Sequence, residues 1–151
     1  MEIVINEWLL EYLRPNADKS NREMALRFVN AWVKRCDKVV IKRESPFVSK
    51  FHTFMKKFEW DFDFTQRSKK LYQLLFLNSD KTIIVDDSDI KKLPADIIEK
   101  TPPKDKYLIE IGYSYPQRVI VTTDRRLRDI FKEETNLKIC LFEDFRKEYF
   151  L

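Results

Sequence analysis

Glycine is almost absent from this chain of 151 residues, in which Gly112 is the single example. Loops that cradle phosphates or dinucleotides need several glycines in one short turn, so the sequence excludes P-loop nucleotide binding and Rossmann-type cofactor binding. His52 is the single histidine, and no spacing suggests a serine or cysteine partner for it. A nucleophilic triad is therefore without support, and His52 is interpreted as a structural residue of an aromatic helix.

Cysteines and long apolar runs are scarce as well. Cys36 and Cys140 are too few and too far apart for a metal clip or a disulfide framework, and we interpret both as buried thiols. No apolar stretch approaches the roughly 20 residues that a membrane-spanning helix needs. The first residues are acidic where a signal peptide is basic. We therefore expect a cytoplasmic protein that makes no membrane contact.

The residues that are present favour one globular domain covering residues 1–151. Hydrophobic residues make up 44% of the chain and charged residues 36%, which suffices for a sizeable core under a polar surface. The chain has 29 basic and 25 acidic residues, for a net charge of +4. This excess permits an anionic partner such as nucleic acid, but it does not identify one.

Short apolar runs alternate with amphipathic stretches along the whole chain. The runs predict strands at residues 3–5, 39–41, 81–85, 119–121 and 137–142. Helical spacing predicts helices at residues 8–13, 20–36, 46–58, 63–78, 93–100, 105–111, 124–133 and 143–150, with N-caps at Ser20 and Ser45. Strands separated by helices pair in parallel, so we expect a three-layer α/β/α fold around a mostly parallel sheet of about five strands.

Polar residues follow every expected strand, at the edge of the sheet where such folds bind ligands. They are Asn6-Glu7, Glu44, Asp86-Asp87, Thr122-Thr123-Asp124 and Glu143-Asp144. Helix capping alone also explains any one of these acids. Asp86-Asp87 would further fit a phosphoryl-accepting pocket of receiver type, so the chemistry stays open on this evidence.

Two C-terminal segments resemble the PIN-domain family of nucleases, whose order of elements also fits the whole chain. In that family an Asp begins a helix that leads to a small residue, and a later hydrophobic strand ends in Thr-x-Asp followed by Leu or Phe. Segments 104–112 and 119–127 follow these two patterns. Four residues match the family positions: Asp105, Gly112, Thr122 and Asp124.

The resemblance implies a carboxylate cluster that binds Mg²⁺ or Mn²⁺ and hydrolyses RNA phosphodiester bonds, as in a divalent-metal-dependent endoribonuclease. Asp105 and Asp124 would be metal ligands, and Thr122, Arg125 and Arg126 would contact the substrate. Small PIN proteins often dimerise and often act as toxins of toxin-antitoxin pairs. A homodimer and an antitoxin-like protein partner are therefore further expectations.

The N-terminal half departs from the family pattern at two positions. Asn6 stands where PIN domains place an Asp, although Glu7 is next to it. Lys50 stands where the family has a Glu, counted from Ser45. Asn6 and Glu7 would complete the catalytic group, while Lys50 would neutralise the pocket and contact substrate. The alternative is a catalytically inactive PIN-like domain that binds RNA or a protein partner.

Overall fold

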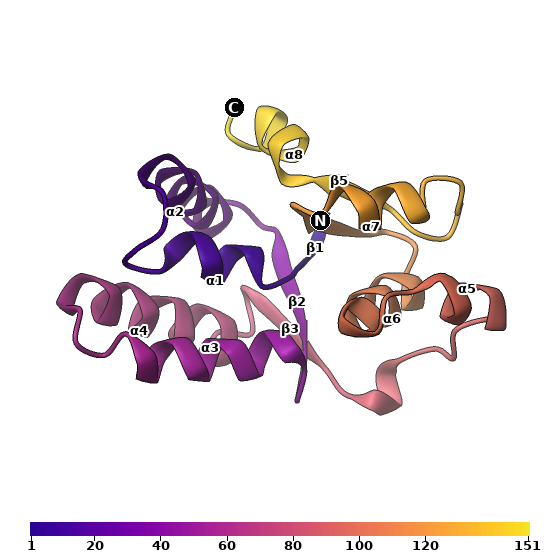
Figure 1. Cartoon of the computed structure of the whole chain (residues 1–151), viewed down its shortest axis with the longest axis horizontal. Coiled ribbons are helices and arrows are strands. Elements are labelled where there is room, and N and C mark those ends of the chain that lie inside the picture. Colours follow the sequence, from indigo (N-terminus) through magenta and orange to yellow (C-terminus); the bar gives the residue numbers. More distant parts are fainter.

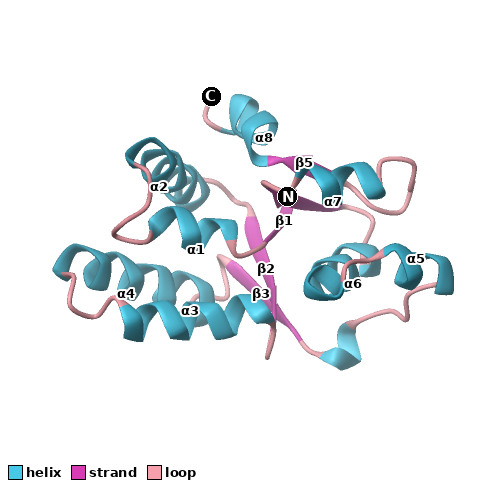
Figure 2. Cartoon of the chain, viewed as in Figure 1, coloured by secondary structure: helices cyan, strands magenta, loops and turns pink.

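Five short strands form one sheet in the computed structural model, which describes all of residues 1–151 (Figures 1 and 2). The strands are β1 (Glu2–Ile5), β2 (Lys38–Lys42), β3 (Thr82–Val85), β4 (Arg118–Thr122) and β5 (Ile139–Leu141). They are rich in Val and Ile, whose branched side chains pack well on a pleated surface covered on both faces. All four neighbouring pairs are parallel, which confirms the predicted fold class.

Helices cover both faces of the sheet. They are α1 (Trp8–Leu13), α2 (Lys19–Lys34), α3 (Pro46–Lys57), α4 (Phe62–Phe76), α5 (Ala95–Lys100), α6 (Lys106–Ser114), α7 (Arg125–Ile130) and α8 (Phe142–Tyr149). Helices α1 to α4 lie on one face and α5 to α7 on the other, which gives the expected three layers (Figure 1). None of them combines the length and apolar character that crossing a bilayer requires.

The order of the strands is β3-β2-β1-β4-β5, so the chain builds outward from β1 in one direction and then in the other. Parallel sheets of this kind bind ligands at the point of reversal, in the crevice beyond the carboxyl ends of the two central strands. Here those strands are β1 and β4, paired from Glu2 with Arg118 to Ile5 with Val121. Residues that follow Ile5 and Val121 therefore border the crevice.

The receiver-type alternative for Asp86 and Asp87 is wrong. Receiver domains have the order 2-1-3-4-5, in which the third strand is central, whereas β3 is an edge strand here. Asp86 pairs with Arg43 at 2.7 Å and Asp87 pairs with Lys42 at 2.8 Å. These aspartates belong to ion pairs at the edge of the sheet.

Two local predictions also need correction. Helix α2 is capped by Asp18, whose side chain accepts a hydrogen bond from the Asn21 amide at 3.3 Å, so Ser20 lies inside the helix. Asp caps helices as well as Ser does, so the helix begins at Lys19, and it ends at Lys34, before the predicted end at Cys36. Cys36 is exposed because it lies in the turn after α2, and Cys140 is only half-buried.

Aromatic packing fixes α8 beside the carboxyl edge of the sheet. The Phe142 ring stacks on Trp8 of α1 with centroids 4.2 Å apart, and Phe28 of α2 contacts both rings edge-on. Such pairs add about 0.5–1.5 kcal/mol to the burial of each ring. The first turn of α8 is therefore held against α1 and α2, next to the crevice.

Candidate active site

The carboxyl ends of β1 and β4 are joined by side chains as well as by the sheet. Asn6 Nδ2 donates a hydrogen bond of 3.2 Å to Thr122 Oγ1, and the backbone amide of Asp124 donates to the same oxygen at 3.1 Å. Trp8 Nε1 donates to the carbonyl of Val121 at 2.8 Å. These five groups all lie at the carboxyl ends of β1 and β4 that border the crevice, so the loops after β1 and β4 hold one another in place.

Asp124 begins helix α7 and has a structural role there. Its Oδ1 atom accepts hydrogen bonds from the amides of Arg126 at 3.0 Å and Leu127 at 3.1 Å. This N-cap fixes the carboxylate at the mouth of the crevice and uses only one of its oxygens. The second oxygen, Oδ2, is left available for another partner.

Asp105 is the most unusual carboxyl group in the chain. It lies in the short turn before α6, it is only 4% exposed, and its buried Oδ2 atom has no hydrogen-bond partner. Burial raises its pKa above the ordinary value; the charge of Lys104 opposes this, and the charges of Asp124 and Glu7 add to it. Asp105 is thus electrostatically coupled to Asp124 and Glu7. We call these three residues the acidic cluster.

Tyr107 positions the third member of the acidic cluster. Its hydroxyl donates a hydrogen bond of 2.9 Å to Glu7 Oε2, and burial together with the Glu7 charge raises the pKa of Tyr107. Glu7 is therefore turned toward α6 and not into solvent. Tyr107 was not singled out from the sequence, where it looks like an ordinary apolar residue of a buried helix.

The donor atoms of the acidic cluster have the chemistry of a magnesium or manganese site. Hard divalent cations prefer carboxylate oxygens, and a buried carboxylate oxygen without a partner is costly unless a cation or proton satisfies it. However, no group of three or more acidic, histidine or cysteine side chains has the spacing to hold a metal ion. The acidic cluster fits such a cation in donor type, and its side chains would have to rotate inward to enclose one.

The four predicted substrate-binding residues fall in different places, and Thr122 is fully buried, where its hydroxyl oxygen is used by Asn6 and the Asp124 amide. Arg126 lines an open depression of about 380 Å³ together with Asp124 and Lys104. Arg125 turns to the other side of Asp124, where its guanidinium pairs with Glu143. Lys50 pairs with Glu11 on α1, and its Nζ atom lies 5.3 Å from the centroid of the Phe54 ring. Its polar contacts do not reach the acidic cluster.

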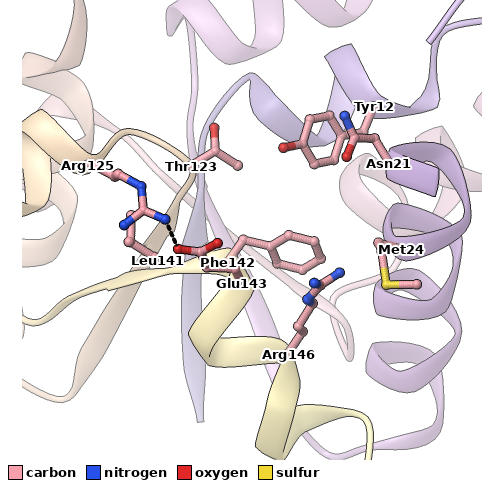
Figure 3. Close-up of a pocket in the computed structure, with 9 residues that line it drawn as sticks. All are labelled: Tyr12, Asn21, Met24, Thr123, Arg125, Leu141, Phe142, Glu143 and Arg146. Atoms are coloured by element: carbon pink, nitrogen blue, oxygen red, sulfur yellow. Dashed lines mark hydrogen bonds and ion pairs between the residues drawn. The ribbon is translucent and has the colours of Figure 1, made fainter. Parts of the chain in front are cut away.

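A cavity of about 190 Å³, which we call the α8 cavity, is lined by Thr123 and Arg125, the two residues on either side of Asp124 in the chain (Figure 3). It is enclosed by the loop after β4, the start of α8, and the facing sides of α1 and α2. Its lining residues are Tyr12, Asn21, Met24, Thr123, Arg125, Leu141, Phe142, Glu143 and Arg146. Apart from Arg125, these residues were not among those predicted from the sequence to contact a substrate.

Comparison with known proteins gave no match to any protein-family model, any curated protein or any solved structure.

Proposed function

We propose that this chain is a PIN-like, divalent-metal-dependent ribonuclease that acts on RNA in the cytoplasm. One observation carries the proposal most directly. At the reversal point of a parallel sheet, the buried and unpartnered oxygen of Asp105 is coupled to the carboxylates of Asp124 and Glu7. Folded proteins rarely keep such a group without a use for it.

Each residue of the site has a definite part in the proposed reaction. Asp105 and Asp124 would hold Mg²⁺ or Mn²⁺, with Glu7 adding a third carboxylate and Asn6 a neutral amide oxygen. A divalent cation at this position would lower the pKa of a bound water and offset charge on the phosphate. Thr122 orients both Asn6 and the backbone at Asp124 by hydrogen bonds.

The cations near the acidic cluster would hold the RNA backbone. Arg126 and Lys104 share an open depression with Asp124, so a phosphate lying there would be close to the proposed catalytic group. Guanidinium groups bind phosphate oxygens in a bidentate manner, which orients the strand as well as attracting it. The expected product is an RNA chain cut by hydrolysis at one phosphodiester bond.

A catalytically inactive PIN-like domain is the second candidate, and the hydrogen bond from Asn6 favours it. The Asn6 amide already donates to Thr122, and an amide carries no charge with which to attract a cation. The Lys50 ammonium is likewise engaged with Glu11. Such a domain would bind RNA or a protein partner without cutting, and chelators would not change its binding.

The deciding experiment is cleavage of end-labelled single-stranded and structured RNA with Mg²⁺, with Mn²⁺ and with EDTA. The wild type is compared with the double variant Asp105→Asn/Asp124→Asn. The matched control is Asp80→Asn/Asp96→Asn, which removes two exposed carboxylates that belong neither to the acidic cluster nor to the lining of the depression beside it.

Metal-dependent cutting that the site variant loses and the control retains is the expected result. Circular dichroism establishes that each variant is folded. Cutting that survives in the site variant, or no cutting by folded wild type with either metal, would overturn the nuclease. Binding of the same RNA in EDTA would then favour the inactive domain.

A further inference from the structure

The α8 cavity contains polar side chains that the fold leaves without partners. Tyr12 and Asn21 face it from α1 and α2, Thr123 faces it from the loop after β4, and Arg146 reaches it from α8 (Figure 3). None of these four side chains forms a hydrogen bond or an ion pair within the chain, whereas the other two charged residues that line the cavity, Arg125 and Glu143, pair with each other. Unpaired polar groups that converge on one hollow are typical of a ligand site.

Two arginines stand on opposite sides of the α8 cavity. Arg146 extends between Phe142 and Met24, and Arg125 on the other wall is held by Glu143 (Figure 3). The charge of Arg146 reaches the Tyr12 hydroxyl, where it opposes the rise in pKa that burial causes. The cavity therefore offers the unpaired guanidinium of Arg146 and the guanidinium of Arg125, for which a bound anion would compete with Glu143. Neutral hydrogen-bond donors lie between the two.

The position of the α8 cavity connects it to the acidic cluster. Thr123 lines the cavity, and the next residue along the chain is Asp124. The depression that contains Arg126 and Lys104 lies on the other side of Asp124. An RNA strand that ran past Asp124 from the α8 cavity to this depression would meet positively charged side chains on both sides of the acidic cluster.

We propose that the α8 cavity binds a phosphate group of the RNA strand that neighbours the bond to be hydrolysed, with Arg146 as its main contact. This inference rests on the proposed function, because it places the phosphate on the strand whose cleavage is assigned to the acidic cluster. The Arg146 guanidinium donates to the phosphate oxygens, and the Tyr12 hydroxyl and Asn21 amide donate from the facing helices. Phe142 and Met24 form the apolar floor and exclude water.

The test measures binding of a fluorescently labelled single-stranded RNA octamer in EDTA, so that no cleavage interferes. Arg146→Gln is expected to weaken binding about tenfold, the effect of losing one charge-assisted contact. It should also reduce the slope of log K against log salt by about 0.7. Arg146→Lys keeps the charge but loses the bidentate geometry, so its affinity for RNA should lie between those of wild type and Arg146→Gln.

Lys147→Gln is the matched control, because it removes one positive charge from the neighbouring residue of α8. Lys147 pairs with Asp144 on the exposed side and does not line the cavity. Its RNA binding should stay within about twofold of wild type. Equal losses in Arg146→Gln and Lys147→Gln, or no binding of RNA by wild type, would overturn the proposal.

A free mononucleotide presents the same phosphate chemistry, so adenosine monophosphate is titrated in parallel. If Arg146→Gln weakened only mononucleotide binding, the RNA assignment would be wrong. The nuclease proposal is tested separately, by metal-dependent cleavage that requires Asp105 and Asp124. If the wild type cleaves RNA and Arg146→Gln binds RNA as tightly as wild type, only the cavity proposal is wrong. If RNA binding depends on Arg146 but no cleavage is seen, only the nuclease proposal is wrong.

Discussion

Asn6 and Thr122, 116 residues apart in the chain, join β1 to β4 by a hydrogen bond of 3.2 Å at the carboxyl edge of the sheet. Thr122 is fully buried, and its hydroxyl oxygen accepts a second hydrogen bond from the Asp124 amide. One small side chain therefore sets the position of the two loops that carry Glu7 and Asp124. The acidic cluster depends on this link for its arrangement.

Replacing Thr122 with valine should destabilise the fold by about 1–3 kcal/mol. Valine has the same shape, but it leaves the Asn6 amide and the Asp124 amide without an acceptor in a buried place. Urea unfolding measures the loss. Thr53→Val is the control, because Thr53 bonds only to the Ser49 carbonyl on an exposed helix face, and its change should stay within about 0.5 kcal/mol. Equal losses at both positions would contradict the role of the buried link.

Asn6→Asp should strengthen metal binding, because it adds a fourth carboxylate beside Glu7, Asp105 and Asp124. Without metal the variant should lose about 1 kcal/mol of stability through repulsion between the carboxylates. Adding Mn²⁺ should raise its melting temperature more than it raises that of wild type, since a ligand bound only by the folded state stabilises it. If the nuclease assignment holds, cleavage by the variant should rise about tenfold, which corresponds to ~1.4 kcal/mol.

Thermal unfolding with and without Mn²⁺ measures this effect. Asn30→Asp makes the same chemical change at an exposed position of α2, and its response to Mn²⁺ should equal that of wild type. An Asn6→Asp variant that responded to Mn²⁺ no more than Asn30→Asp would show that the acidic cluster does not bind the cation.

The fold was predictable because its signals are local. Apolar runs such as Val39-Val40-Ile41 and caps such as Ser45-Pro46 require only neighbouring residues, and the structure confirms both, with β2 over Lys38–Lys42 and Ser45 capping α3. The order of the strands was not predictable in this way. It depends on which strands pair across the sheet, and the five runs have nearly the same composition.

The candidate site was only partly predictable, for a related reason. Asp105 and Asp124 stand at the ends of predicted elements, so their positions along the chain identified them. Tyr107 meets Glu7 across 100 residues, and Arg146 faces a cavity built by four separate segments. Neither residue has a distinctive sequence context, because a tyrosine in an apolar helix and an arginine in a charged helix are both ordinary.

Asp105→Asn should make the protein more stable at neutral pH. The raised pKa means that folded Asp105 keeps its proton where the unfolded chain, with a pKa near 3.8, has released it. The stability of wild type therefore falls as pH rises from about 4 through the raised pKa, and the variant lacks this loss. At pH 7 we therefore expect a higher melting temperature for the variant, by about 2–4 °C for each kcal/mol of stability gained.

Melting curves of wild type and Asp105→Asn between pH 3 and pH 8 check this expectation. The melting temperatures of the two proteins should be nearly equal at pH 3, where both side chains are neutral, and should differ increasingly above that pH. Asp80→Asn, at an exposed carboxylate, should show no comparable separation. A variant that was less stable than wild type at pH 7 would mean that the buried carboxylate is satisfied in the folded protein.

Gly112→Ala should destabilise the contact between α6 and β4. An added methyl group would lie 2.6 Å from Cδ1 and 3.0 Å from Cγ1 of Ile120, which is fully buried, so the Ile120 side chain would have to shift against its core neighbours. Alanine favours the helix by about 1 kcal/mol, but overpacking a core costs about 1–3 kcal/mol, so we expect a net loss of about 1 kcal/mol.

A double-mutant cycle with Ile120→Val separates these two effects. Valine lacks the Cδ1 atom that the new methyl group would strike, so Gly112→Ala should cost nothing in that background, or should stabilise it by up to about 1 kcal/mol. Urea unfolding of the four proteins gives the coupling energy. If the two substitutions were simply additive, the close approach to Ile120 would not explain the glycine. Because Tyr107 lies in the first turn of α6, two residues after Asp105, a clash that shifts this helix should also weaken the hydrogen bond from Tyr107 to Glu7.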